Sequence, residues 1–261
     1  LEGNETAIIA HPDVQRMLFS MKAKTAASRA VCMMTARMID IAERAKDKSV
    51  SEPAHAMASL YTPVAKAFST DIGVDVASEG VQVHGGMGFI EETGAAQHLR
   101  DARIAPIYEG TNGIQAIDLV TRKLPVEEGA PVKQHIADLK DILDDVKASN
   151  LPAFGNTASC LEEAVTALDD ATSWILTALT DNPRGALAGA TPYLRLFGIA
   201  SGGTWLAKGA LNATRNGNSE NAVILARYYA KMHAVEAPGL ARAIMDGASW
   251  ASPETADRLA G

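Results

Sequence analysis

Apolar residues spaced three and four positions apart recur along most of this chain, and this periodicity constrains its fold more than any other feature. Residues with that spacing lie on one face of an α-helix, whereas the alternating apolar pattern of a strand is scarce here. The sequence therefore predicts an all-α protein. In the second half of the chain the spacing, or its seven-residue multiple, relates Ile136, Leu139, Leu143 and Val146, and then Leu161, Val165, Leu168, Ile175 and Leu179.

Two long helices are expected at the start of the chain. The first opens at Pro12 and Asp13, because proline costs no hydrogen bond in the first turn, and it should continue to about residue 46. The second is expected over residues 51–83, with a kink at Pro63. Its predicted buried face contains Leu60, Val64, Ala67 and Phe68.

The first helix contains five methionines, and Met34, Met38 and Ile41 fall on one stripe of it. Methionine is flexible and polarizable, so such a stripe can form an adaptable ligand-binding surface. Packing in the core is the simpler interpretation. We expect core packing here and keep the binding surface as the alternative.

The sequence HGGMGF (84–89) should end the second helix, because paired glycines disfavour its continuation. A short helix is then expected over residues 95–104, and another from residue 110 to about residue 123. Between these two helices lies the sequence YEGTNG (108–113). It places a single carboxylate, Glu109, at a break between helical segments.

The sequence LPVEEGAPV (124–132) combines prolines, a glycine and acids, which is typical of a linker. Four more helices are expected beyond it. The third should cover about residues 184–214. The apolar face of the fourth should contain Leu225, Tyr228, Met232 and Val235. We therefore predict a domain over residues 1–124, a linker over 125–131 and a helical, bundle-like extension over 132–261.

Composition excludes several classes of function. The net charge of −7 and the pI near 5.4 argue against binding to nucleic acid, which usually requires a basic surface. No apolar run approaches the ~20 residues of a membrane-spanning helix, and no signal-peptide pattern is visible. The chain opens on LEGNETAIIAHPD without an initiator methionine, so we expect it to be part of a longer protein.

The two cysteines, Cys32 and Cys160, lie far apart in apolar helical contexts. We expect both to be reduced thiols in the core, since neither has the Cys/His spacing of a metal site. Reduced thiols indicate a reducing compartment, which favours a cytoplasmic location.

Glu109 suits a general base, which must be held within reach of a proton and partly shielded from water. The backbone N–H groups at a helix start are free, and Gly110 permits close approach of another molecule. The alternative is a first-turn acid that favours the helix dipole by ~0.3–1 kcal/mol. Spacing alone leaves both interpretations open.

The glycine-rich turn is also ambiguous. Backbone amides at Gly85, Gly86 and Gly88 could contact a phosphate, but the turn lacks the strand–glycine–helix context of a dinucleotide fingerprint, and helix termination is the commoner reason for such glycines. His84 could act as a base, although a hydrogen-bonded histidine at a helix end is the simpler interpretation. No second histidine stands at ligand spacing, so no metal site is expected.

The sequence VQVHGGMGFIEETGAAQHLRDARIAPIYEGTNGIQAIDLV (81–120) resembles the C-terminal helical domain of the acyl-CoA dehydrogenase family. The glycine turn, RDARI, YEGT and IQ occur together and in order, and the resemblance covers roughly residues 8–124. Residues 132–258 resemble the additional helical region of a longer bacterial subgroup that includes 3-methylmercaptopropionyl-CoA dehydrogenase. The implied fold is that helical bundle followed by a second bundle-like extension.

The resemblance implies a flavoprotein that oxidises the Cα–Cβ bond of an acyl-CoA, with Glu109 as the general base. Tyr108 and Gly110 would border the acyl-CoA. Arg100 and Asp101 would form a salt bridge that positions the catalytic loop. The residues implied to contact FAD are Gln82, Val83, His84, Gly85 and Gly86, often from a neighbouring subunit, and Thr111, Asn112 and Gly113, of which Gly113 would use only its backbone.

The resemblance also implies an electron acceptor and an oligomeric assembly, and it indicates which parts of the family's fold this chain lacks. Electron-transfer flavoprotein is the expected electron acceptor, and a homodimer or tetramer is the expected assembly. The family's N-terminal helical domain and middle β-domain are not in this chain, so we expect the chain alone neither to hold FAD tightly nor to turn over. The alternatives are a helical interaction or oligomerisation module without catalysis, and an acyl-CoA oxidase.

Overall fold

A computed structural model of the chain describes residues 7–217 and 220–260, and every regular element within these ranges is a helix. The predicted all-α class is therefore confirmed. The α-helices are α1 (Pro12–Arg44), α2 (Lys48–Val83), α3 (Gly86–Phe89), α4 (Ala95–Ala102), α5 (Asn112–Asp118), α6 (Ala130–Ala148), α7 (Thr157–Asp181), α8 (Pro183–Ala188), α9 (Ala190–Arg215), α10 (Glu220–Met232), α11 (Ala237–Asp246) and α12 (Pro253–Ala260). Short 3₁₀ turns and a π-helical turn, η3 (Leu119–Lys123), connect several of them.

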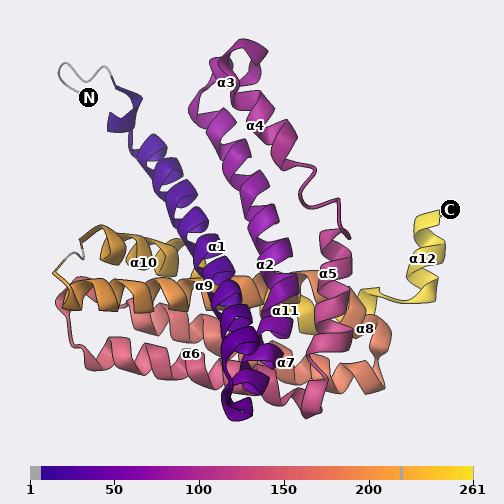
Figure 1. The fold of residues 1–261 in the computed structure, drawn as a ribbon. Helices are drawn as coiled ribbons and strands as arrows, with labels where there is room; N and C mark the ends of the chain where they lie inside the picture. Colours follow the sequence, from indigo (N-terminus) through magenta and orange to yellow (C-terminus); the bar gives the residue numbers. More distant parts are fainter. Residues whose placement is uncertain (1–6, 218–219, 261) are drawn as a thin grey trace.

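The long helices α1 and α2 form an antiparallel pair that crosses a layer made of α6, α7, α9 and α10 (Figure 1). One end of the pair projects beyond this layer, and there α3 and α4 pack against the end of α2. Helix α5 returns along α2 toward the layer and contacts both α2 and α9. The chain thus places the loop between α4 and α5 beside the middle of α2.

Local chemistry explains where α1 and α2 begin. Pro12 occupies the first turn of α1, as predicted. The side chain of Asp47 caps α2 by accepting a hydrogen bond from the N–H of Ser49 at 2.9 Å. Pro63 lies within α2, which is one uninterrupted element, and the predicted face of Leu60, Val64 and neighbouring residues is buried.

The prediction that the methionines of α1 pack in the core is wrong in part. Met17 is buried, but Met33 is 70 % exposed and Met34 and Met38 are only partly covered. The face of α1 that packs against its neighbours consists mainly of small residues, including Ala23 and Ala27. Small side chains allow close approach of helices, so the longer methionines lie at the margins of the contact.

The expectation of a buried thiol is also wrong for Cys32, which is exposed, while Cys160 is partly buried. Both are free thiols. The Cys32 Sγ lies 3.3 Å from the Ser69 Oγ on α2. The buried face of α1 instead contains Ser28, Val31 and Thr35, and Cys32 lies at the edge of that face.

The helix predicted over 184–214 is in fact two helices, α8 and α9, separated at Gly189. The physical reason is Pro192. A proline lacks the N–H that would bond to the carbonyl of residue 188 in a continuous helix, but it is tolerated in the first turn of a new one. The side chain of Asn182 caps α8 by accepting from the N–H of Gly185 at 3.1 Å.

The apolar face predicted for the last long helix is wrong as well. Met232 ends α10 and is 46 % exposed, and Val235 lies beyond α10 and is 54 % exposed. Two neighbouring stripes of α10 both contain apolar residues three and four positions apart. The stripe that contains Ala226 and Tyr229 is the one that is buried. Its alanines let α10 approach α9 closely, while Leu225 and Tyr228 pack at the edge, toward α1.

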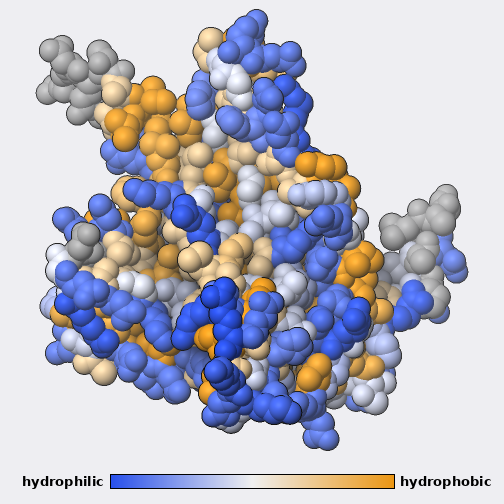
Figure 2. Space-filling model, viewed as in Figure 1, coloured by the Kyte–Doolittle hydropathy of each residue, from blue (hydrophilic) through white to orange (hydrophobic). Residues whose placement is uncertain are grey.

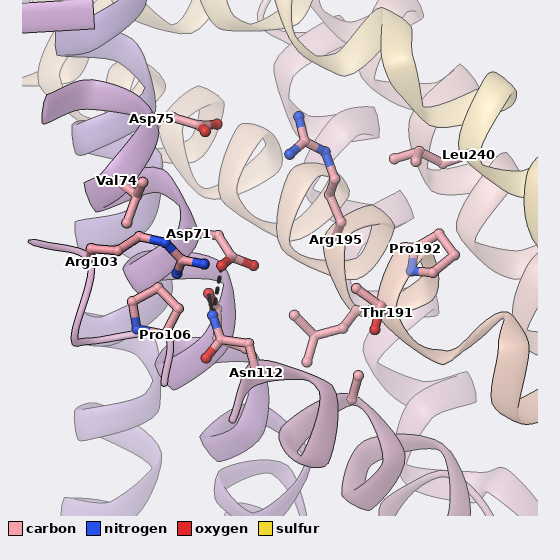
Figure 3. A pocket seen from close by; sticks show the side chains of 13 residues that line it. Asp71, Val74, Asp75, Arg103, Pro106, Asn112, Thr191, Pro192, Arg195 and Leu240 are labelled. Atoms are coloured by element: carbon pink, nitrogen blue, oxygen red, sulfur yellow. Dashed lines mark hydrogen bonds between the residues drawn. The ribbon is translucent and has the colours of Figure 1, made fainter. Parts of the chain in front are cut away.

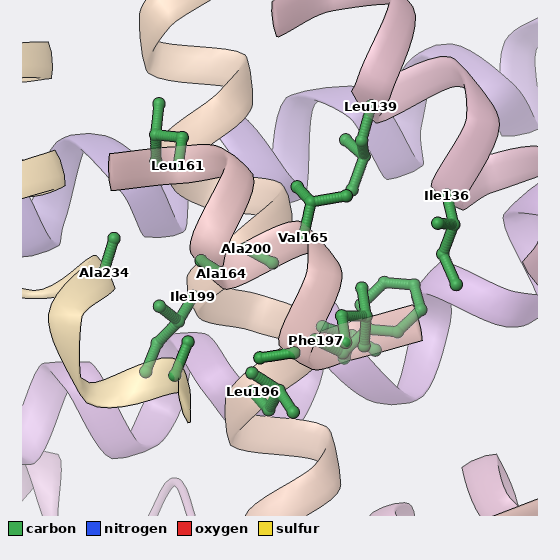
Figure 4. Close-up of a cluster of buried hydrophobic side chains, with 14 of the residues drawn as sticks. Ile136, Leu139, Leu161, Ala164, Val165, Leu196, Phe197, Ile199, Ala200 and Ala234 are labelled. Atoms are coloured by element: carbon green, nitrogen blue, oxygen red, sulfur yellow. The ribbon is translucent and has the colours of Figure 1, made fainter. Parts of the chain in front are cut away.

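The two halves of the chain share one hydrophobic core. Phe68 of α2 belongs to the same cluster as Leu139 of α6, Leu161 of α7 and Phe197 of α9. Several of these side chains are seen together in Figure 4. The segment 125–131 contains a short 3₁₀ turn, Val126–Gly129, and leads directly into α6 at Ala130. Leu124 before this segment and Gly129 within it are buried. The helices after residue 132 therefore complete the core that α1 and α2 begin.

A buried polar network joins the two halves within this core. The Nε2 of His135 lies 2.9 Å from the Ser201 Oγ and 3.3 Å from the Tyr61 OH, and the Trp205 Nε1 donates to that OH at 2.9 Å. These residues come from α2, α6 and α9. Burial lowers the pKa of His135 to about 3, so this imidazole is neutral at physiological pH.

This histidine predicts how stability depends on pH. In the unfolded chain the pKa of a histidine is ~6.5. Below that pH the unfolded chain binds a proton at His135, whereas the folded protein does not until the pH approaches 3. The contribution of neutral His135 to the free energy of unfolding is therefore fully present above about pH 6.5. It is lost, at up to ~1.4 kcal/mol per pH unit, as the pH falls toward 3. Urea denaturation at pH 7.5, 6 and 5 should show the decline. His135→Gln should make the decline less steep and leave the part due to His233, whose pKa burial lowers to about 4. An unchanged slope would contradict the assignment.

Candidate active site

The loop over residues 103–111 connects α4 to α5 and holds Glu109. Two backbone hydrogen bonds shape it, from Tyr108 N to Ile104 O at 3.1 Å and from Asn112 N to Pro106 O at 2.9 Å. Glu109 has φ of 53° and Gly110 has φ of 82°, so both adopt the left-handed conformation. For a residue with a Cβ this conformation costs roughly 1–2 kcal/mol. The surrounding structure must therefore hold Glu109 in place.

Two side chains hold this turn. The ammonium Nζ of Lys66, on α2, donates to the carbonyl of Gly110 at 2.8 Å and to the Asn112 Oδ1 at 2.7 Å. The Gln115 Nε2 donates to the carbonyl of Glu109 at 3.4 Å. The turn is thus fixed from α2 on one side and from α5 on the other.

Asn112 anchors the start of α5. Its side chain is buried, and its Nδ2 donates to the Asp71 Oδ1 at 2.7 Å and to the Ala67 carbonyl at 3.1 Å. Burial raises the pKa of Asp71, and the hydrogen bond from Asn112 opposes that rise. The amide of Asn112 is therefore used within the chain, although the sequence led us to expect it at a cofactor.

The outer side of the turn is open. Glu109 is exposed, and among the described residues no group accepts a hydrogen bond from its N–H or from that of Gly110. Thr111 caps α5, since its Oγ1 accepts from the N–H of Ile114 at 3.3 Å. A carboxylate with free N–H groups beside it can take a proton from a bound molecule while those N–H groups contact an oxygen of the same molecule.

Exposed apolar residues surround this open turn. Tyr108 is 53 % exposed, Ile104 55 % and Ile114 55 %. These apolar side chains next to Glu109 are left uncovered by the described residues. In Figure 2 apolar surface is also visible over the projecting part of α1, which lies on the opposite side of α2 from this loop in Figure 1.

The glycine-rich turn follows the C-terminal end of α2, whereas the Glu109 loop lies beside its middle. The Nδ1 of His84 is 2.8 Å from the Gly80 carbonyl, so His84 is the hydrogen-bonded histidine at a helix end that the sequence favoured. Gly85 has φ of 60°, and an added Cβ there or at Gly86 would meet no atom within 4 Å. At 1.5 Å per residue, Asp71 and the last residue of α2 are roughly 18 Å apart. The two segments expected at the cofactor thus do not meet within one chain.

The expected salt bridge between Arg100 and Asp101 is absent from the described residues. Arg100 instead lies 3.5 Å from the carboxylate of Glu91. Neighbouring residues on a helix point about 100° apart, so adjacent side chains do not face each other. Arg100 therefore ties α4 to the turn before it, not to the loop of Glu109.

A cavity of about 560 Å³ lies behind the loop, between α2, α5 and α9 (Figure 3). Sequence reasoning missed the charged residues that line this cavity, which are Asp71, Asp75, Arg103 and Arg195. It also missed Lys66, which binds the carbonyl of Gly110 in the loop. Lys66, Thr70 and Asp71 form a polar patch on α2 beside its predicted buried face, and this patch was the available signal. In the described part of the chain no group of His, Cys, Asp or Glu is arranged to hold a metal.

Comparison with protein families decides the identity of this arrangement. Residues 2–124 match the family model described as acyl-CoA dehydrogenase, C-terminal domain. Residues 129–251 match a second model, described as acetyl-CoA dehydrogenase C-terminal like. The chain belongs to the acyl-CoA dehydrogenase family. It consists of the helical C-terminal region of that family followed by the additional helical region.

Curated relatives agree with this assignment. The chain is 42 % identical over 206 residues to 3-methylmercaptopropionyl-CoA dehydrogenase of Ruegeria pomeroyi, which covers 79 % of this chain and 35 % of the relative. It is 34 % identical over 168 residues to butyryl-CoA dehydrogenase of Syntrophomonas wolfei, covering 64 % of this chain and 27 % of the relative. The chain thus spans about a third of the length of these dehydrogenases or less.

Solved acyl-CoA dehydrogenase structures share the fold. Caenorhabditis elegans ACDH-11 in complex with C11-CoA superposes with a TM-score of 0.69 at 22 % identity, over 84 % of this chain and 36 % of that one. An acyl-CoA dehydrogenase from Bacillus anthracis complexed with FAD superposes with a TM-score of 0.71 at 17 % identity, over 100 % of this chain and 46 % of that one. No helix in the described ranges is both long and apolar enough to cross a bilayer.

Proposed function

We propose that this chain is the C-terminal part of an FAD-dependent acyl-CoA dehydrogenase, which oxidises the Cα–Cβ bond of an acyl-CoA to give a 2-enoyl-CoA. The observation that supports it best is the turn at Glu109. A single carboxylate is held there in a left-handed conformation, with free N–H groups and apolar surroundings. That arrangement suits proton removal beside a carbonyl group.

The proposed chemistry assigns a step to each group. Glu109 takes the proton from Cα, and the electrons of that bond form the new double bond to Cβ. As the proton leaves, negative charge develops on the thioester oxygen, and the N–H of Glu109 donates a hydrogen bond to it. Such a donor is typically worth several kcal/mol in the transition state. FAD, when bound, would accept the hydrogen of Cβ as hydride. Tyr108 and Gly110 would border the acyl-CoA.

The residues proposed to hold FAD fit that role at the backbone. Gly85 and Gly86 present open backbone at an exposed turn, so a nucleotide could approach closely. Gln82, Val83 and His84 lead into this turn. Thr111 and Gly113 are exposed beside Glu109, whereas the side chain of Asn112 is buried and its N–H donates to the Pro106 carbonyl. The two segments lie roughly 18 Å apart along α2, and the family resemblance implies that the glycine-rich turn contacts the FAD of a neighbouring subunit. We therefore propose a homodimer or tetramer.

The remaining proposals concern the whole protein. Glu109 is exposed in this chain, and a general base must be partly shielded from water, so we propose that other parts of the complete protein shield it. The chain alone should therefore neither hold FAD tightly nor turn over. Electron-transfer flavoprotein is the proposed electron acceptor and the cytoplasm the proposed location. The named relatives make 3-methylmercaptopropionyl-CoA and butyryl-CoA the first substrates to test.

Purification of the complete protein tests this function. We expect a flavin absorbance spectrum that bleaches on addition of an acyl-CoA, and turnover with a dye acceptor in the absence of oxygen. Oxygen consumption at the same rate would indicate an oxidase instead. A colourless protein without turnover, but with a defined oligomeric state, would favour a helical assembly module.

A further inference from the structure

The left-handed turn at Glu109 depends on a chain of charged and polar groups that begins at Lys66. The Lys66 ammonium donates both to the Gly110 carbonyl at 2.8 Å and to the Asn112 Oδ1 at 2.7 Å. The Asn112 Nδ2 in turn donates to the Asp71 carboxylate at 2.7 Å. A cation and an anion therefore bind opposite ends of one buried amide, and hydrogen bonds to charged groups are the stronger kind.

This chain of groups controls the orientation of the turn. The carbonyl of Gly110 points inward, toward α2, because Lys66 binds it there. Asn112 fixes the start of α5 two residues later. Between these two points the backbone has little freedom, so the free N–H and side chain of Glu109 are left on the outer face. Without Lys66, the cost of the left-handed conformation would favour a relaxed turn.

We propose that Lys66 is a positioning residue for Glu109, acting through the Gly110 carbonyl and the Asn112–Asp71 pair. This inference rests on the proposed function, and it adds a residue that would not touch the substrate. A displacement of about 1 Å at a reacting group can cost on the order of 10²-fold in rate. Loss of Lys66 should therefore lower kcat more than it changes KM.

The chain offers a matched control. Lys133 donates to the carbonyl of Glu128 at 2.9 Å, in the turn where Glu127 and Glu128 are also left-handed. Like Lys66, it donates from its ammonium group to a backbone carbonyl in a left-handed turn, but this turn is exposed, precedes α6 and does not contain Glu109. Lys66→Met and Lys133→Met should thus each remove a lysine-to-carbonyl hydrogen bond at a left-handed turn, and Lys66→Met also removes the bond to the Asn112 Oδ1. Only Lys66 lies near the proposed reacting groups.

The test uses the complete protein. We expect Lys66→Met to lower kcat by roughly 10–100-fold, with KM within a factor of about two and the flavin spectrum unchanged. Lys133→Met should keep kcat near the parent value, and Lys66→Arg should recover most of the loss, because it restores a cationic donor. Equal kcat values for Lys66→Met and Lys133→Met would overturn the proposal.

A second readout separates this inference from the proposed function. Amide hydrogen exchange over residues 108–113 should be faster in Lys66→Met than in the parent and in Lys133→Met. If the parent protein does not oxidise any acyl-CoA, the proposed function fails, while faster exchange still supports the positioning of the turn. Unchanged exchange would overturn the role of Lys66 whatever the activity.

Discussion

Glu109→Gln in the complete protein should lower kcat by roughly 10²–10⁴-fold, the range that a positioned general base supplies. Glutamine has nearly the same shape as glutamate and can keep the left-handed turn, but its amide cannot accept the proton. Flavin content and thermal stability should stay at the parent values. Single-turnover reduction of the flavin by an acyl-CoA, and exchange of the α-hydrogen with deuterium from solvent, measure the step directly.

The control for this variant is Glu127→Gln. Glu127 is also an exposed glutamate with positive φ, at 48°, but it lies in the turn before α6. We expect it to leave kcat unchanged. Parent-like turnover or α-hydrogen exchange in Glu109→Gln would exclude Glu109 as the base. The carboxylate would then be a first-turn acid beside a helix N-terminus.

Gly198→Ala should destabilise the protein by roughly 1–3 kcal/mol, because it overpacks the contact between α9 and α2. A Cβ on Gly198 would lie 2.4 Å from the Cδ2 of Phe68, whose side chain is buried in the core. This loss should exceed the gain of up to ~1 kcal/mol that alanine brings to a helix interior. Urea denaturation should show a lower midpoint.

Gly209→Ala is the matched control in the same helix. Nothing lies within 4 Å of an added Cβ at Gly209, so only the helix propensity changes and stability should rise by ~0.5–1 kcal/mol. Combining Gly198→Ala with Phe68→Leu should cost less than the sum of the single changes, because the smaller side chain makes room. A Gly198→Ala protein as stable as the parent would contradict the close contact.

Periodicity predicted the long helices well, since α1, α2, α6 and α7 each contain many turns of one pattern. It failed where a single residue or a choice between neighbouring stripes decided the outcome. Pro192 divides α8 from α9. In α10, Tyr229 rather than Tyr228 faces the hydrophobic core. The break at Pro192 is a local backbone effect that apolar spacing does not register, whereas the choice of stripe on α10 depends on packing partners that periodicity does not specify.

The residues of the candidate site were likewise predicted only in part. Glu109 stood out because a carboxylate at a helical break, within a family-like motif, is visible along the chain. Lys66 and Asp71 did not, because their bonds to Gly110 and Asn112 join residues more than 40 positions apart. Such contacts depend on how α2 and α5 pack. The sequence shows the polar patch on α2 but does not show which loop it meets.

The position of α9 has a consequence for biosynthesis. Phe68 and Val64 of α2 form one core with Phe197 of α9, so their partner emerges from the ribosome about 130 residues later. Contacts of such long sequence separation form late, and the apolar face of the nascent α2 stays uncovered until then. A translational pause before residue 190 would prolong that exposure and favour aggregation or chaperone capture of the growing polypeptide.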